Sequence, residues 1–582
     1  MKIDDPHSSK NKYLTIVLVL LSLLLVISLF KNISYPLFWA DESMTVMGGV
    51  RVLEFGYPKV HDGKNVLYDL SHPNTSLGLD EKTDAYIGGA NWGQYYFAAL
   101  GIKLAEMTDD LFAKTAIIRV PFGLIGLAGL AILALLGRQF FHTKLSKTGF
   151  LTLFVFFEVI SVPLVLHLRE ARYYSLTVFL TALTILVYTR YRILKITRYS
   201  TYALLLVVFL FLGFFNFSPV YFILFVSFSL FESIQLIKQL LSKHRGNTGE
   251  SGIPTFTRKG IFKDYLLALL PMIISLIVIL PLISFFKTFS IAEEMSKYNA
   301  QIYNISGLEM YVDNLAEIWK YFALSDFIYL AIFLKSCLLL SLIKTSDKDI
   351  PSTEKFRVRF SNLLTTIFII YFFAIARIPN FPFTRYFITL QPILALIILL
   401  DSASVYNVIT QLRMPVRLYA KVVLAVIIAV FLFINVRTNY EYLKGHVYEI
   451  SNQYRGPLDY LIPFIKDKYS KTDDLVIATN YEETSYMYYL NAKVIVGYVG
   501  NNIVQDSQTT PDIIIYRNLH KIFIPIFANF FEKQPYDRIS FPVADSKTNN
   551  IPELNWQPPF HHQFRTKNVW DELDKIELFV RK

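Results

Sequence analysis

Residues 13–30 read YLTIVLVLLSLLLVISLF, a run without a single charge, and this stretch decides the fold class. A membrane-spanning helix needs about 20 mostly apolar residues. The run follows Lys10 and Lys12 as in a signal peptide, but no small-residue cleavage site follows Phe30, so we expect a retained helix. Similar apolar runs occur at 117–137, 149–168, 173–189, 201–217, 219–240, 265–286, 324–343, 361–378, 386–402 and 419–436. We therefore predict a polytopic α-helical membrane protein with about eleven transmembrane helices.

The overall composition agrees with a membrane location. Of the 582 residues, 53% are hydrophobic and only 18% are charged. Soluble chains average about 25% charged residues, so a string of soluble domains is excluded, and the apolar content excludes a mainly disordered chain. The net charge of +11 comes from basic residues between apolar runs rather than from a basic tail, so we expect no nucleic-acid partner. The single cysteine, Cys337, excludes an intrachain disulfide framework and a multi-cysteine zinc site.

The distribution of lysine and arginine predicts the orientation in the membrane. With the N-terminus inside, the loops on the inner side are all basic, and they are 138–148, 190–200, 241–264, 344–360 and 403–418. The loops left outside are 31–116, 287–323, 379–385 and the tail from Arg437. The segment 95–108 is short and carries Lys103 and Glu106, so we interpret it as an interfacial helix. Counting it as a span would place the basic loops outside.

Two domains follow from this topology. Residues 1–436 form the transmembrane domain, with the large first outer loop 31–116, and residues 437–582 form an extracytoplasmic α/β domain. In the second domain, strand-like runs occur at 475–479, 494–499, 512–516, 538–543 and 575–580. They alternate with helical patterns at 455–470 and 517–531, and no glycine-rich phosphate loop accompanies them.

Charged residues near the outer ends of spans are costly in or beside a membrane and are therefore candidates for function. Asp41 and Glu42 open a helical stretch after the first span, where Asp41 is alternatively a helix cap. Glu170 and Arg172 belong to HLREARYY (167–174), a turn between two spans that is alternatively only a salt-bridged connection. Two more arginines, Arg119 and Arg385, lie at starts of spans on this side. Arg385 belongs to PNFPFTRY (379–386), and alternatively its side chain only reaches lipid headgroups.

These residue types fit one kind of chemistry. Carboxylates act as general bases, and arginines hold phosphate groups through paired hydrogen bonds. A lipid-anchored phosphate with its head group at the outer leaflet would suit both, with displacement at a sugar carbon as the reaction. The arginines would then stabilise the departing phosphate. Spacing alone does not bring the clusters together.

The order of these motifs resembles that of the GT-C membrane glycosyltransferases. It is most similar to the broad family 39/83-like group that includes protein O-mannosyltransferases and lipid A aminoarabinose transferases. The resemblance rests on the pair Asp41–Glu42, on Arg119 two residues before Pro121, on REARYY (169–174), and on RYFITLQPILAL (385–396). It covers roughly residues 13–402, and in the tail only 475–496 resembles the outer domain of some bacterial members.

The resemblance implies a bacterial cytoplasmic (inner) membrane enzyme that moves a sugar from a polyprenyl-phosphate donor to an acceptor hydroxyl with inversion. The acceptor is a protein, lipid or glycan, no cofactor is implied, and a divalent metal is not excluded. By the same resemblance, Asp41 is the base, with Glu42 and Glu170 as further acidic site residues. Arg119, Arg172 and Arg385 lie near the phosphate.

The chain also departs from this group, and other functions stay open. Many relatives carry a Pro-Pro-Leu motif before the second span, whereas this chain has NWGQYY at 91–96. His61 and His72 in the first outer loop have no matched partner, so we predict no metal site from them. The alternative functions are a transporter or flippase, and a polymerase or ligase of lipid-linked surface glycans.

Overall fold

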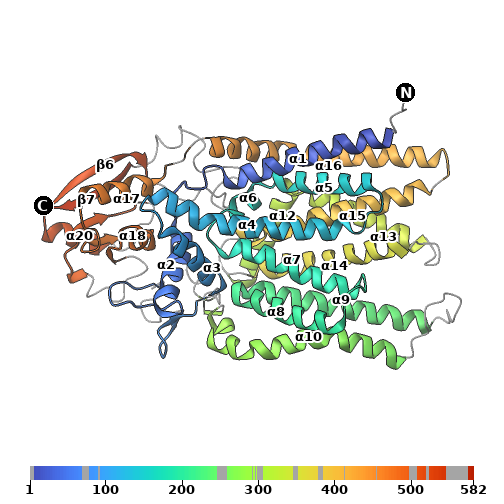
Figure 1. Ribbon diagram of the computed structural model, residues 1–582, viewed down its shortest axis with the longest axis horizontal. Coiled ribbons are helices and arrows are strands. Elements are labelled where there is room, and N and C mark those ends of the chain that lie inside the picture. Colours follow the sequence, from blue (N-terminus) through green and yellow to red (C-terminus); the bar gives the residue numbers. More distant parts are fainter. Residues whose placement is uncertain are drawn as a thin grey trace.

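The computed structural model shows a helical bundle with a small sheet at one end and two helices, α2 and α3, between them (Figure 1). It describes residues 6–67, 78–88, 92–244, 258–291, 293–294, 297, 306–344, 352–377, 384–411, 413–451, 453, 455–496, 507–518, 524–545 and 575–582.

The bundle consists of long apolar helices. They are α1 (Pro6–Phe30), α4 (Leu111–Arg138), α5 (Lys144–Ile160), α6 (Val162–Leu168), α7 (Tyr173–Arg192), α8 (Tyr199–Asn216), α9 (Ser218–His244), α10 (Arg258–Phe285), α12 (Gly307–Ser325), α13 (Ile328–Lys344), α14 (Ser352–Ile375), α15 (Leu390–Thr410) and α16 (Val416–Ser451). Among the described residues, eight helices are long and apolar enough to cross a membrane, or ten if each of two bent helix pairs counts as one span. The polytopic helical class is confirmed.

One predicted span, 173–189, is not among the helices that are apolar enough to cross a membrane, and its composition is the reason. The run 173–189 forms α7, but α7 ends with Arg190 and Arg192 and carries several threonines and tyrosines. Most of its side chains are buried between neighbouring helices, among them α4 and α8. A helix enclosed by other helices tolerates such residues, since it does not face lipid. The number eleven stays a prediction.

Two of the predicted spans contain sharp breaks. The predicted span 149–168 bends by 78° between α5 and α6, where Pro163 has no N–H to donate to the carbonyl of Val159. The predicted span 324–343 starts at a second break, an 86° bend between α12 and α13. There Phe327 has a left-handed backbone with φ of 59°, which ends a helix.

The first outer loop has its own secondary structure. It contains α2 (Ala40–Phe55), the short hairpin of β1 (Leu79–Asp80) and β2 (Ala85–Tyr86), and α3 (Trp92–Ala105). Helix α2 stops at Gly56, whose φ of 83° suits glycine and whose N–H donates to the carbonyl of Val52. Helix α3 corresponds to the predicted interfacial segment, and it is shorter than a membrane span requires.

The C-terminal part is an α/β unit, as predicted. Its sheet has the strand order β4-β3-β5-β7-β6, with β3 (Val476–Thr479) parallel to both β4 (Lys493–Ile495) and β5 (Ile513–Ile515), and β7 (Lys575–Arg581) antiparallel to β5 and β6 (Tyr536–Ala544). All five predicted strands are confirmed. The helices of the unit are α17 (Pro457–Lys468), α18 (Glu483–Leu490) and α20 (Ile524–Lys533).

The C-terminal unit shares a hydrophobic core with the first outer loop. Leu37, Phe38 and Val46 from the loop pack in the same buried cluster as Leu458 and Tyr486 from the C-terminal unit. Two hydrogen bonds reinforce this contact. The carboxylate of Asp459 accepts from the N–H of Leu37 at 2.8 Å, and the hydroxyl of Tyr489 accepts from the N–H of Phe38 at 3.1 Å. The chain just before α2 is therefore fixed by residues more than 400 positions later.

Candidate functional site

Three segments that are distant in sequence meet around the carboxylate of Asp41. Its Oδ2 atom lies 2.7 Å from Nη1 of Arg385 in the 3-10 turn η2 (Thr384–Tyr386), and 3.4 Å from Nη2 of Arg172 between α6 and α7. Arg172 also donates to the backbone carbonyl of Asp41 at 3.0 Å and to the hydroxyl of Thr45 at 3.1 Å. The carboxylate of Asp41 thus bridges two arginines.

Asp41 is the most accessible member of this group. Its side chain is 28% exposed, against 15% for Arg172 and 16% for Arg385. The cap alternative for Asp41 is wrong, because Trp39 occupies the N-cap position of α2 and Asp41 lies inside the first turn. A carboxylate in the first turn is still favoured by the helix dipole. The helix dipole therefore stabilises Asp41 at this position, and its side chain is still in contact with solvent.

Glu42 points away from Asp41 and forms a buried ion pair with Arg119. Nε and Nη2 of Arg119 lie 2.8 and 2.5 Å from the two carboxylate oxygens of Glu42. The Nη1 atom of Arg119 donates to the carbonyls of Ile33 and Pro36 at 2.8 and 2.7 Å, and the guanidinium lies 5.1 Å from the ring centre of Phe38. The pair fixes the chain before α2 against α4.

Glu170 lies behind the Asp41 group. One of its oxygens accepts from the indole N–H of Trp39 at 3.0 Å, and the other lies 3.0 Å from Nδ1 of His167. Burial, and then the negative charge of Glu42, raise the pKa of Glu170 well above its usual range. The protonated form of Glu170 is therefore favoured more than in an exposed glutamate.

Several residues of the site were not predicted from the sequence. Trp39 lies against the guanidinium of Arg385, with 5.8 Å to the ring centre, while its N–H holds Glu170. Gln94 accepts from the hydroxyl of Thr45 at 3.0 Å and from the N–H of Tyr173 at 3.1 Å. Trp39 lies two residues before Asp41 in the sequence, and this position could have marked it as a site residue. Nothing in the sequence around Gln94 marks it.

All six predicted site residues gather at the bundle end that faces the C-terminal unit, but they divide into two sets. Asp41, Arg172 and Arg385 form the accessible set. The other three, Glu42, Arg119 and Glu170, are buried. Segment 379–383 and His72 lie outside the described residues.

Among the described residues, no group of three or more histidine, cysteine, aspartate or glutamate side chains has a geometry that could hold a metal ion. His61 is engaged instead with Asp84, whose Oδ1 lies 2.5 Å from Nδ1 of the imidazole.

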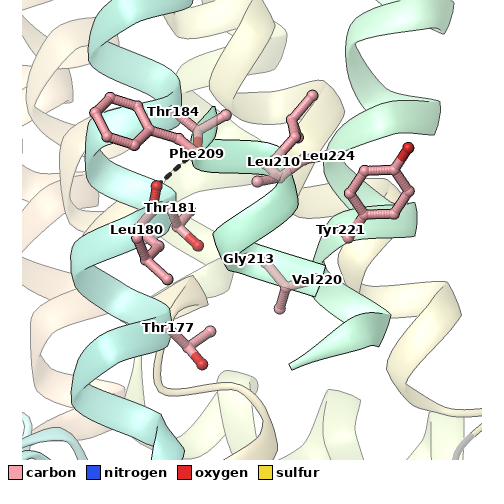
Figure 2. Close-up of a pocket in the computed structure, with 10 residues that line it drawn as sticks. All are labelled: Thr177, Leu180, Thr181, Thr184, Phe209, Leu210, Gly213, Val220, Tyr221 and Leu224. Atoms are coloured by element: carbon pink, nitrogen blue, oxygen red, sulfur yellow. Dashed lines mark hydrogen bonds between the residues drawn. The ribbon is translucent and has the colours of Figure 1, made fainter. Parts of the chain in front are cut away.

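A small cavity inside the bundle has a different character. It holds about 10 Å³ between α7, α8 and α9, and Figure 2 shows Thr177, Thr181 and Thr184 from α7 facing it. The hydroxyl of Thr184 donates to the carbonyl of Leu180 at 2.7 Å. This volume suits one water molecule at most. The cavity has no ionisable carboxylate or basic side chain in its lining, so it offers no site for the proposed chemistry.

No protein-family model and no curated protein matches the chain. Among solved structures, the chain is similar to the crystal structure of ArnT from Cupriavidus metallidurans bound to undecaprenyl phosphate. The sequence identity is 9%, the TM-score is 0.44, and the match covers 91% of this chain and 96% of that chain.

Proposed function

We propose that the protein is a membrane glycosyltransferase that moves a sugar from a polyprenyl-phosphate donor to an acceptor hydroxyl at the outer face. The observation that supports this most is the carboxylate of Asp41 held between Arg172 and Arg385 and still partly open to solvent. An inverting displacement at the anomeric carbon of a polyprenyl-phosphate sugar requires a base for the acceptor hydroxyl and groups that bind the leaving phosphate. The acceptor is a protein, lipid or glycan hydroxyl.

In this mechanism the donor phosphate accepts hydrogen bonds from Arg172 and Arg385. Their attraction to the phosphate weakens their ion pairs with Asp41. The carboxylate of Asp41 then takes the proton of the acceptor hydroxyl while the oxygen of that hydroxyl attacks the anomeric carbon. The bond from that carbon to the phosphate oxygen breaks, and the phosphate leaves with the electron pair and keeps its contacts to the arginines. Trp39 holds the guanidinium of Arg385 in place.

The buried residues take a structural part in this proposal. Glu42 and Arg119 neutralise each other, and Glu42 also accepts from the N–H of Ala171 at 2.9 Å, next to Arg172. The pair thereby fixes the turn that presents Arg172 relative to α2. Glu170 supports Trp39 from behind. We assign Glu42, Arg119 and Glu170 as positioning residues.

A transporter or flippase is the second candidate, and the two broken helices favour it. Transporters often build their substrate sites at helix breaks. The two functions differ in their need for a base, because transport requires no proton transfer from an acceptor hydroxyl.

The decisive experiment measures sugar transfer from a polyprenyl-phosphate donor in membranes that contain the protein. Asp41→Asn should abolish transfer while the amount of folded protein stays unchanged. The matched control is Glu54→Gln, which removes a half-exposed carboxylate from the same helix and should retain activity. Full transfer by Asp41→Asn would contradict the assignment of the base, and normal movement of lipid-linked sugar without any transfer would favour the transporter.

A further inference from the structure

The two helix breaks of the bundle lie against each other around a second small cavity. The α5–α6 break supplies Glu158 and Ser161 to its lining, and the α12–α13 break supplies Ser325 and Asp326. Gln391 from α15 completes the polar part of the wall, next to Asn439 from α16. The cavity holds about 20 Å³, enough for one water molecule or one dehydrated ion.

The polar atoms around this cavity are buried and unpartnered. Both carboxylate oxygens of Glu158, the hydroxyls of Ser161 and Ser325, and Oε1 of Gln391 have no hydrogen-bond partner among the described residues. The four side chains are at least nine-tenths buried, and Glu158 is only 1% exposed. A buried polar atom without a partner costs about 1–3 kcal/mol. Several such atoms around one cavity therefore require an explanation.

The amide of Gln391 is oriented by its neighbours. Its nitrogen donates to the hydroxyl of Tyr321 at 2.6 Å and to Oδ2 of Asp326 at 3.2 Å. Because both donor directions are used, Oε1 is left for the cavity. The site therefore offers oxygen atoms from two carboxylates, one amide and two hydroxyls, and its lining contains no lysine, arginine or histidine.

The number and kind of these oxygens fit the ligands of a shared ion. Calcium binds oxygen at about 2.3–2.6 Å, so two oxygens on opposite sides of one calcium ion lie about 5 Å apart. Oxygens at that separation do not hydrogen-bond to one another, and the unpartnered oxygens of the cavity make no hydrogen bond among the described residues. Two carboxylates balance the charge of one divalent cation, and calcium tolerates the irregular mixture of oxygen ligands better than magnesium does.

The helix ends strengthen the same preference. Helix α5 ends at Ile160 and helix α12 ends at Ser325, so the cavity lies at two helix C-termini. The partial negative charge at a helix C-terminus favours a cation. Asp326 is only partly buried, so this part of the cavity wall reaches the protein surface.

We propose that this cavity, lined by Glu158, Ser161, Ser325, Asp326 and Gln391, is a calcium-binding site that joins the two broken helices. Helix α6 spans only seven residues between the cavity and the turn of Glu170 and Arg172, a distance of about 10 Å along the helix. Bound calcium would fix the end of α6 that lies away from that turn. This proposal does not depend on which reaction the Asp41 group performs.

The test is equilibrium dialysis of radioactive calcium with the full-length protein in detergent after chelator treatment. We expect about one calcium ion per chain, and a rise in the unfolding temperature with calcium. Glu158→Gln and Asp326→Asn should each weaken binding at least about tenfold. The control is Glu317→Gln, which changes a partly exposed carboxylate on α12 that lies 3.9 Å from Lys320, and it should bind as the wild type does.

A folding defect is distinguished from loss of a ligand by measuring stability in chelator. Because Glu158→Gln removes a buried charge, its unfolding temperature without calcium should equal or exceed that of the wild type. If that variant fails to fold, Ser161→Ala removes a single hydroxyl ligand and should weaken binding in a folded chain. Absence of calcium binding by the wild type, binding as tight as that of the wild type by both carboxylate variants, or stabilisation by sodium but not by calcium would overturn the proposal.

Discussion

The guanidinium of Arg385 lies 2.7 Å from the carboxylate of Asp41, although the two residues are 344 positions apart. One follows the first membrane helix and the other precedes α15. Their contact gives the accessible set its shape, because Arg172 reaches the same carboxylate oxygen from a third segment. It also creates the competition on which the proposed mechanism depends, since a donor phosphate and Asp41 seek the same guanidinium groups.

The first prediction concerns donor binding. Arg385→Ala should raise the KM for the polyprenyl-phosphate donor more than the KM for the acceptor, because it removes one of the two proposed phosphate ligands. Arg377→Ala is the matched control, as Arg377 lies 5.7 Å from the ring centre of Tyr311 rather than beside Asp41. Steady-state kinetics with each substrate varied in turn provide the measurement. An unchanged donor KM in Arg385→Ala would speak against the phosphate role.

The second prediction separates stability from catalysis at the buried pair. Arg119→Ala leaves Glu42 as an unpaired buried charge and should lower the free energy of unfolding by about 3–5 kcal/mol. The double change Arg119→Met with Glu42→Gln removes both charges and should recover much of that loss, which thermal unfolding in detergent would show. If Arg119→Ala left stability intact but abolished transfer, Arg119 would belong with the phosphate ligands.

How much of this site the sequence could predict depends on the kind of contact. The clusters around Asp41, Glu170 and Arg385 were recognisable because charges beside apolar runs are costly, and the predicted membrane topology placed them on one side. Which carboxylate pairs with which arginine could not be predicted. Asp41 and Glu42 are neighbours in sequence, yet they face different partners because adjacent side chains on a helix point in different directions.

The fold likewise divides into features that a local sequence pattern predicts and contacts between distant segments that it does not predict. Strands of the C-terminal unit were predicted because short β-branched runs carry their own signal. The break at Ser161 was missed because the hydropathy of 149–168 is continuous across it, although Pro163 was a visible cause. Packing of the C-terminal unit on the first outer loop could not be predicted, since it joins segments more than 400 positions apart.

A third prediction concerns pH and the contact between Asp459 and Leu37. Burial raises the pKa of Asp459 to about 7 from a usual 3.8, against the effect of the N–H groups of Leu37 and Gly456. The folded state then holds a proton that the unfolded state has released between about pH 4 and 7. This contribution to stability is complete below about pH 4 and is lost as the pH rises through about 7.

The measurement is the unfolding temperature from pH 4 to 8 for the wild type and for Asp459→Asn. The difference between the two curves should change steadily across this interval, because asparagine does not titrate. Parallel curves would contradict the assigned pKa direction.

The fourth prediction tests the membrane orientation. A reporter enzyme that is active only outside the cytoplasm, fused after Lys582, should be active, and a fluorescent reporter that folds only inside should stay dark at the same place. A fusion within the basic loop 241–264 should give the opposite result. Cytoplasmic activity of the C-terminal fusion would overturn the predicted topology.

The contact of Leu37 and Phe38 with Asp459 and Tyr489 has a consequence for biosynthesis. Asp41 lies three residues after Phe38, so this anchor of its position forms only after the ribosome has translated the chain past residue 489. A nascent chain whose bundle helices have already entered the bilayer would still lack this contact beside the Asp41 group. Under the proposed function, sugar transfer would begin only once the C-terminal unit has docked on the segment before α2.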